Sequence, residues 1–168
     1  MGRRSPSACP GRRDEAASPG EIVILLSAPE ETEALGARLA PFLRPGDVIA
    51  LYGELGTGKT TLARGILRGL GFNGEVASPT FPIVLPYDSL RLPVWHVDLY
   101  RTEKPAEIDE LALDEALEEG ALIVEWPERL EARLWPEALR LTLTRQGEGA
   151  RALTADVPAA WGGRWPPR

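Results

Sequence analysis

The sequence predicts an α/β fold of three layers, in which helices cover both faces of a mixed, partly parallel sheet. Short apolar runs typical of buried strands alternate with segments of helical periodicity, and two pairs of extended segments are spaced as hairpins. The chain has 168 residues, of which 43% are hydrophobic, so we expect one ordinary core and a single domain.

We expect this domain to span residues 21–157. Residues 1–20 are rich in Pro, Gly, Ser and Arg and contain no apolar run, which predicts a disordered leader. Residues 158–168 are also rich in Pro and Gly and are predicted to form a loose tail. No apolar run approaches the length of a membrane span, and the single cysteine, Cys9, excludes an internal disulfide. These features predict a cytoplasmic protein without a membrane partner.

The charge of the chain argues against a protein that binds nucleic acid by itself. The formal net charge is -6, although four arginines face only two acids in the first twenty residues. The predicted domain is therefore more acidic than the chain as a whole. Such a surface is a poor ligand for a phosphate backbone.

The first half of the predicted domain consists of two strand and helix units. Residues 21–27 are expected to form a strand, and a helix over 29–43 follows with apolar residues at nearly helical spacing. Residues 48–52 are a fully apolar run of the buried-strand type. A glycine-rich loop follows this run, and the next apolar pattern predicts a helix over 60–71.

The second half is predicted to contain a hairpin with proline-marked edges, one acidic helix closed by Gly120, a buried strand, and a closing hairpin with alternating faces. These segments are, in order, 81–87 with 92–100, 105–120, 121–126, and 138–144 with 150–156.

The glycine-rich loop satisfies the P-loop pattern G-x-x-x-x-G-K-[ST] between a buried strand and a helix. Its glycines allow backbone N–H groups to turn inward around an anion, and the helix adds its positive end. Lys59 is one of only two lysines in the chain, and its compact ammonium fits among phosphate oxygens better than a guanidinium. The hydroxyl of Thr60 is offered to Mg2+ between the β- and γ-phosphates. The predicted binding residues are Gly53, Glu54, Leu55, Gly56, Thr57, Gly58, Lys59, Thr60 and Thr61.

A P-loop NTPase fold also needs a carboxylate at the end of a neighbouring buried strand, where open α/β sheets collect their ligands. Glu125 ends the apolar run 121–124, and Asp98 ends the run "VWHVD". The residues themselves leave both acids open as partners of the metal.

Three further residues have both a functional and a structural interpretation. Thr80 follows Pro79, which stiffens the backbone so that the Thr80 hydroxyl can sense a terminal phosphate; a plain turn is the alternative. Trp126 could cover the nucleotide, although a core tryptophan is more common. The lone His96 is expected to pack or bond within the sheet rather than act as a base.

Together, the segments "GELGTGKTTL", "SPTF", "HVDLYR" and "EWPE", in this order and at these short intervals, resemble the TsaE (YjeE) family. Its members are small bacterial ATPases that assist the formation of threonylcarbamoyladenosine on tRNA. The resemblance covers about residues 21–156. It implies ATP and Mg2+ as ligands, and weak ATP hydrolysis that partner proteins control.

The resemblance also implies roles for individual residues. Thr60 and Glu125 would ligate the metal, and Asp98 would be needed for activity. Thr80 would be the threonine of a switch region. The implied neighbours of the nucleotide are Trp126, Thr32 in the loop 29–32, and the turn at Gly147.

The implied partner is a threonylcarbamoyl transferase complex of TsaD and TsaB type proteins, with tRNA reached indirectly through that complex. The ATPase would reset the complex for further turnover. A small-molecule kinase is the first alternative, but no lid-like insertion is evident. A GTPase is the second, but neither lysine lies in an N-K-x-D motif.

Overall fold

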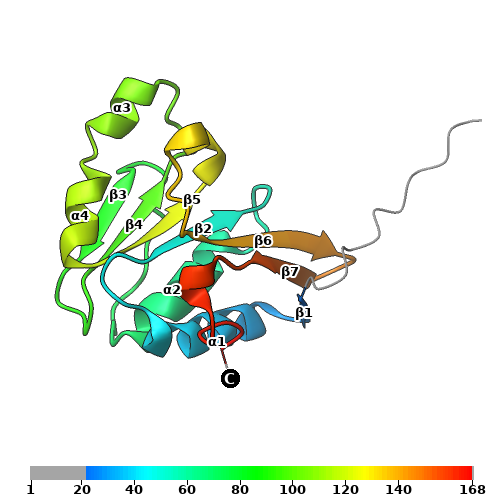
Figure 1. The fold of residues 1–168 in the computed structure, drawn as a ribbon. Helices are drawn as coiled ribbons and strands as arrows, with labels where there is room; N and C mark the ends of the chain where they lie inside the picture. Colours follow the sequence, from blue (N-terminus) through cyan, green and yellow to red (C-terminus); the bar gives the residue numbers. More distant parts are fainter. Residues whose placement is uncertain (1–21, 168) are drawn as a thin grey trace, which may run out of the picture.

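Seven strands form one mixed sheet in the computed structural model, which describes residues 22–167 (Figure 1). The strand order is β1-β7-β6-β2-β5-β4-β3. The leader predicted for residues 1–20 lies outside the described residues. The strands are β1 (Val23–Leu26), β2 (Val48–Tyr52), β3 (Val84–Tyr87), β4 (Val94–Asp98), β5 (Ala121–Glu125), β6 (Leu139–Gln146) and β7 (Ala150–Asp156).

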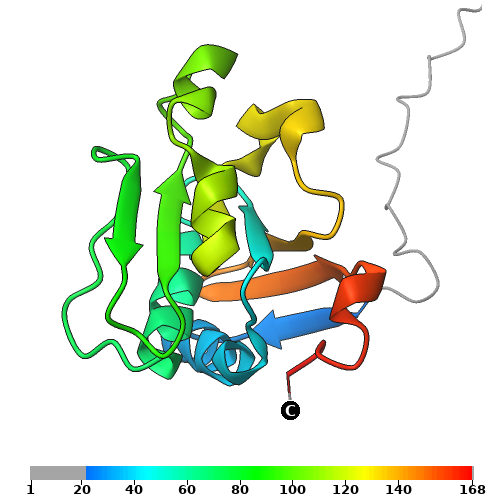
Figure 2. The same cartoon turned by 60° about the vertical axis from the view of Figure 1, so that its left-hand side comes forward.

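Helical segments lie on both sides of this sheet, with α1 and α2 packed together on one side (Figure 2). The α-helices are α1 (Pro29–Leu39), α2 (Lys59–Gly69), α3 (Pro105–Asp109) and α4 (Leu113–Glu119). Three short 3-10 segments are η1 (Ala40–Phe42), η2 (Pro127–Arg133) and η3 (Ala159–Trp161). None of the helices within residues 22–167 is long and apolar enough to cross a membrane.

The central strand β2 shows why the fold has three layers. Ile49 and Leu51 pack in the first core, which is shared with α1 and α2, whereas Val48 and Ala50 pack in the second core, on the opposite face. Successive side chains of a strand point to opposite faces, so a strand that is apolar throughout needs a cover on both sides. The predicted α/β class with three layers and a mixed, partly parallel sheet is confirmed.

Four neighbouring strands, β6, β2, β5 and β4, run parallel, and the pairs at both edges are antiparallel. Both predicted hairpins are present, as β3 with β4 and as β6 with β7. Pro86 lies in β3, the edge strand, where its missing N–H costs no ladder bond. Because β2, β4 and β5 are parallel, their carboxyl ends lie side by side, and the P-loop follows the end of β2.

The single helix predicted over residues 105–120 is wrong. It is broken into α3 and α4 at Ala112, which adopts a left-handed conformation with φ of 52°. Ile108 and Leu113 are both buried in the second core. Because these residues are five apart, they cannot share one face of a continuous helix, and the break brings both to the core.

The helix predicted over residues 29–43 is shorter as an α-helix than expected. It ends at Leu39 and continues as the 3-10 segment η1. Pro41 lacks the N–H that a further α-helical turn would require, which accounts for the change.

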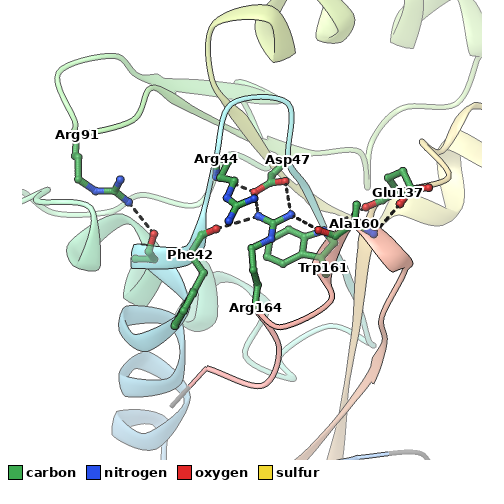
Figure 3. Close-up of polar contacts among 9 residues, drawn as sticks. Phe42, Arg44, Asp47, Arg91, Glu137, Ala160, Trp161 and Arg164 are labelled. Atoms are coloured by element: carbon green, nitrogen blue, oxygen red, sulfur yellow. Dashed lines mark hydrogen bonds and ion pairs between the residues drawn. The ribbon is translucent and has the colours of Figure 1, made fainter.

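The loose tail predicted for residues 158–168 is also wrong for the part that the structure describes. The Trp161 side chain is fully buried in the first core, and the Arg164 guanidinium is stacked on its ring. Arg164 also donates to both carboxylate oxygens of Asp47, at 2.6 and 3.1 Å, and to the Phe42 carbonyl oxygen at 2.9 Å (Figure 3). Proline and glycine content gives no sign of this anchoring, because it depends on one tryptophan and one arginine.

Candidate functional site

The P-loop joins the end of β2 to the start of α2, as the motif predicts. Gly58 precedes the helix with φ of 104°, a left-handed conformation that favours glycine. Among residues 22–167, no side chain caps the first turn of α2. Its N–H groups are therefore available to an anion, and the helix dipole favours negative charge there.

Lys59 is only 4% exposed although it carries a charged group. Its Nζ donates to the carbonyl oxygens of Gly53 at 2.6 Å and Glu54 at 2.9 Å. The ammonium also lies 4.4 Å from the centre of the Trp126 ring. Burial lowers the pKa of Lys59, and the nearby carboxylates, Glu125 foremost, oppose that shift. An ammonium that has lost its water in this way is suited to bind a phosphate oxygen.

Asp98 and Glu125 occupy directly paired positions at the ends of β4 and β5. Each is 3% exposed. The Oε1 atom of Glu125 accepts a hydrogen bond from the Thr60 hydroxyl at 2.9 Å and lies 2.8 Å from Nε2 of His96. Because a carboxylate accepts, the histidine tautomer with hydrogen on Nε2 fits this contact. His96 bonds within the sheet, as predicted.

Asp98 holds the loop that contains Thr80. Its Oδ2 accepts from the Thr80 hydroxyl at 2.8 Å, and its Oδ1 accepts from the Tyr100 backbone N–H at 2.9 Å. The Ser78 and Thr80 hydroxyl oxygens are 2.9 Å apart. The "SPTF" segment is therefore tied to the acidic end of β4.

These groups surround one cleft of about 310 Å³. It is lined by twelve of the residues that the sequence analysis named, which are Thr32, Leu55, Gly56, Thr57, Gly58, Lys59, Thr60, Thr61, Thr80, Asp98, Glu125 and Trp126.

Three predicted residues do not line the cleft. The Gly53 and Glu54 carbonyl oxygens contact Lys59 instead. Gly147 is exposed in the turn between β6 and β7, whereas Gly149, after the turn, lines the cleft. Hairpin spacing locates the turn but not which of its residues faces inward.

Tyr100 and Arg151 also line the cleft, and the sequence analysis gave neither a role. A signal for Arg151 is present in the alternation of "ARALTAD", because Arg151 shares the strand face of the buried Leu153. Tyr100 follows β4 and packs on Trp126, with ring centres 4.9 Å apart. Nothing in the sequence pattern identifies that contact.

The donor set fits Mg2+ bound together with a polyphosphate. No group of three His, Cys, Asp or Glu residues within the described part of the chain could hold a metal ion alone. The Thr60 hydroxyl and the Glu125 carboxylate present two oxygen atoms 2.9 Å apart that could ligate such an ion. Magnesium is commonly held by one or two protein oxygens while phosphate oxygens and water complete its shell.

Known proteins resemble this chain over most of its length. The profile of the family described as threonylcarbamoyl adenosine biosynthesis protein TsaE matches residues 26–153. A tRNA threonylcarbamoyladenosine biosynthesis protein TsaE from Bacillus subtilis is 42% identical over 127 residues, which cover 75% of this chain and 79% of that protein. The Streptomyces coelicolor protein of the same name is 43% identical over 135 residues, covering 78% and 91%.

A solved structure, Bacillus subtilis YdiB, superposes with a TM-score of 0.73 at 34% identity, and the match covers 86% of this chain and 90% of that one. The matched profile runs from the last residue of β1 into β7 and so includes the P-loop and both acids of the cleft. The chain therefore belongs to the TsaE family of threonylcarbamoyl adenosine biosynthesis proteins.

Proposed function

We propose that this protein binds ATP with Mg2+ in the cleft and hydrolyses it in support of threonylcarbamoyladenosine formation on tRNA. The observation that carries the proposal is the buried Lys59 ammonium of the P-loop, placed beside the paired carboxylates of Asp98 and Glu125. The phosphates would pair with the ammonium, and the metal ion would pair with the carboxylates. The relatives' names supply the link to the tRNA modification.

In this proposal the phosphates bind to Lys59 and to the N–H groups at the start of α2. Thr60 and Glu125 would hold Mg2+, and the ion would neutralise part of the negative charge on the phosphate oxygens. Asp98 fixes the Thr80 hydroxyl, and the pair would orient the water that attacks the terminal phosphate.

The proposed partner is a transferase complex of TsaD and TsaB type proteins, which the protein would reset for further turnover. The Phe81 side chain, beside Thr80, is 81% exposed, and Leu55 at the tip of the P-loop is 70% exposed. Apolar side chains presented this close to the phosphates suit a protein contact that depends on the bound nucleotide. The acidic balance of the chain agrees with tRNA being reached through the complex.

The two lysines provide a matched test. We expect Lys59→Ala to abolish saturable binding of Mg-ATP in titration calorimetry, because the buried ammonium and its phosphate contact are lost. Lys104→Ala, which removes an exposed lysine outside the cleft, should bind as the wild type does. Equal ATP affinity in the two variants would reject the phosphate site.

Hydrolysis is measured with the same variants, with and without the transferase complex and tRNA. The wild type and Lys104→Ala should release phosphate faster in the presence of the complex, and Lys59→Ala should not respond. Binding of ATP without any change of hydrolysis on adding the complex would contradict the proposed partnership while leaving the nucleotide site intact.

A further inference from the structure

Two arginines of the β6 and β7 hairpin lie against the P-loop. The Nη2 atom of Arg145 donates to the Leu55 carbonyl oxygen at 2.9 Å. Arg151 donates from Nε to the Thr57 carbonyl oxygen at 3.1 Å and from Nη2 to the Gly56 carbonyl oxygen at 3.2 Å. Two side chains thus hold three consecutive carbonyl groups of a loop that precedes them by 90 to 95 residues.

The strand register places these two charges directly opposite each other. Arg145 pairs with Arg151 across β6 and β7, and the next pair on the same face is the buried Leu143 with Leu153. Like charges directly opposite each other destabilise a strand pair. Within residues 22–167 neither arginine forms an ion pair with a carboxylate. The two guanidinium groups therefore donate their hydrogen bonds to the loop carbonyl groups instead of to a carboxylate.

A held carbonyl group also fixes the N–H group of the same peptide plane. The C=O and N–H of a trans peptide point in opposite directions. Arg145 on the Leu55 carbonyl therefore directs the Gly56 N–H away from the hairpin, and Arg151 on the Thr57 carbonyl directs the Gly58 N–H in the same way. Neither N–H donates to a backbone acceptor in the described part of the chain. A cation on the carbonyl also polarises the peptide and makes its N–H a stronger donor.

We propose that Arg145 and Arg151 form a carbonyl clamp, a pair of positioning residues that aim the Gly56 and Gly58 N–H groups at the phosphates. The proposal rests on the ATP site proposed above and deepens it. Arg151 lines the cleft, but its third nitrogen, Nη1, donates to the Ala150 carbonyl oxygen at 2.9 Å. Each of its three nitrogen atoms thus donates one hydrogen to a carbonyl group, and these contacts hold the guanidinium against the loop.

Three variants and one control test the clamp. Arg151→Gln removes both the charge and the planar guanidinium that reaches two carbonyl groups. Arg151→Lys keeps the charge but not the guanidinium. Arg145→Gln removes the single hydrogen bond to Leu55. The control is Arg140→Gln, on the opposite face of β6, where Arg140 donates to Asp156 at 3.0 Å. Thermal denaturation of each variant checks that it is folded.

The first readout needs no nucleotide. The backbone order parameters of Gly56 and Gly58, from 15N relaxation of the free protein, should fall in Arg151→Gln from about 0.85 to below about 0.6. Arg145→Gln should show a smaller fall, confined to Gly56. Arg140→Gln should match the wild type.

The second readout is the dissociation constant of Mg-ATP. We expect it to rise about tenfold in Arg151→Gln, because two charge-assisted hydrogen bonds to a partly exposed loop are lost. Arg151→Lys should not restore the affinity, since a single ammonium cannot span two carbonyl groups as a fork does.

Two results would overturn the clamp. Restored affinity in Arg151→Lys would mean that the charge acts alone, and a loss of affinity with unchanged order parameters would mean that Arg151 contacts the nucleotide directly. Failure of the wild type to bind ATP would instead reject the proposed function. A loss of order in Arg151→Gln would in that case still show that Arg151 holds the loop, so the two failures are distinguishable.

Discussion

A single carboxylate oxygen joins several parts of the candidate site. Oε1 of Glu125 is contacted by the Thr60 hydroxyl from α2 and by His96 from β4. Its position is therefore fixed from two sides before any metal arrives. A contact such as that of His96, which is not itself a proposed ligand, commonly orients a metal ligand and tunes its affinity.

Replacing Glu125 by Gln tests this role with little change of shape. The amide oxygen can still accept from Thr60 and His96, but the negative charge that Mg2+ requires is removed. We expect the gain in ATP affinity on adding Mg2+ to fall at least about tenfold. The measurement is calorimetric titration of ATP with Mg2+ and with EDTA.

Glu128→Gln is the control, because this exposed acid lies three residues further along and does not line the cleft. An unchanged magnesium gain in Glu125→Gln would assign the metal to Asp98. The sequence pattern alone left this choice open, since both acids end buried strands. The structure pairs them in register but gives only Glu125 a contact with Thr60.

At the scale of the elements, α1 and α2 are packed so closely that side chains are excluded between them. A Cβ atom added to Gly65 in α2 would lie 2.0 Å from the Glu33 carbonyl oxygen in α1. The close crossing lets α2, which begins at the P-loop, lie flat against α1 and the sheet. Glycines within helices are therefore packing residues here, although a sequence pattern shows them as weak helix positions.

We expect Gly65→Ala to lower the stability of the fold. Alanine favours a helix over glycine by about 1 kcal/mol. Overpacking costs about 1 to 3 kcal/mol. Because the added Cβ would meet backbone at 2.0 Å, we expect a cost near the upper end, which exceeds the gain. The thermal midpoint should fall by about 4 °C or more.

Ala34→Ser, at an exposed position of α1, should leave the midpoint of thermal unfolding unchanged within about 2 °C. A Gly65→Ala variant as stable as the wild type would show that the two helices can separate at little cost.

The sequence predicted the elements where local patterns decide them. The uniform apolar run of residues 48–52, the P-loop after it and the two hairpins were all located correctly. It failed at Ala112, where burial of Ile108 and Leu113 overrides an acidic helical pattern. The spacing of apolar residues along the chain predicts each helix separately. It does not show which side chains from different elements pack together in the core.

At the scale of the whole molecule, the segment after β7 completes the first core. Trp161 fills the core beside α1 and the sheet, and its indole N–H donates to the Glu137 carbonyl oxygen at 3.2 Å. Arg164 covers the ring and neutralises Asp47. Trp161 and Arg164 lie beyond the matched family profile, which ends at residue 153.

We expect Trp161→Ala to destabilise the protein by about 3 to 5 kcal/mol, since a large core side chain is replaced by a cavity. Arg164→Ala should cost about 3 kcal/mol, because the nearly buried Asp47 would lose its ion-pair partner and keep only the contact from the Arg44 N–H. Denaturant unfolding at neutral pH measures both changes.

Val157→Ala, at a side chain that is 37% exposed, is the matched control and should differ little from the wild type. Unchanged stability in Trp161→Ala and Arg164→Ala would mean that this segment is an accessory to the core rather than part of it.

The place of β7 between β1 and β6 has a consequence for synthesis on the ribosome. Within residues 22–167, the first strand, β1, pairs with β7 alone, near the other end of the domain. A nascent chain therefore carries β1 unpaired, with the apolar Val23 and Leu25, until nearly all of the domain has been translated. Closing so long a loop is slow, so we expect chaperones to hold the emerging polypeptide by this strand until translation reaches β7.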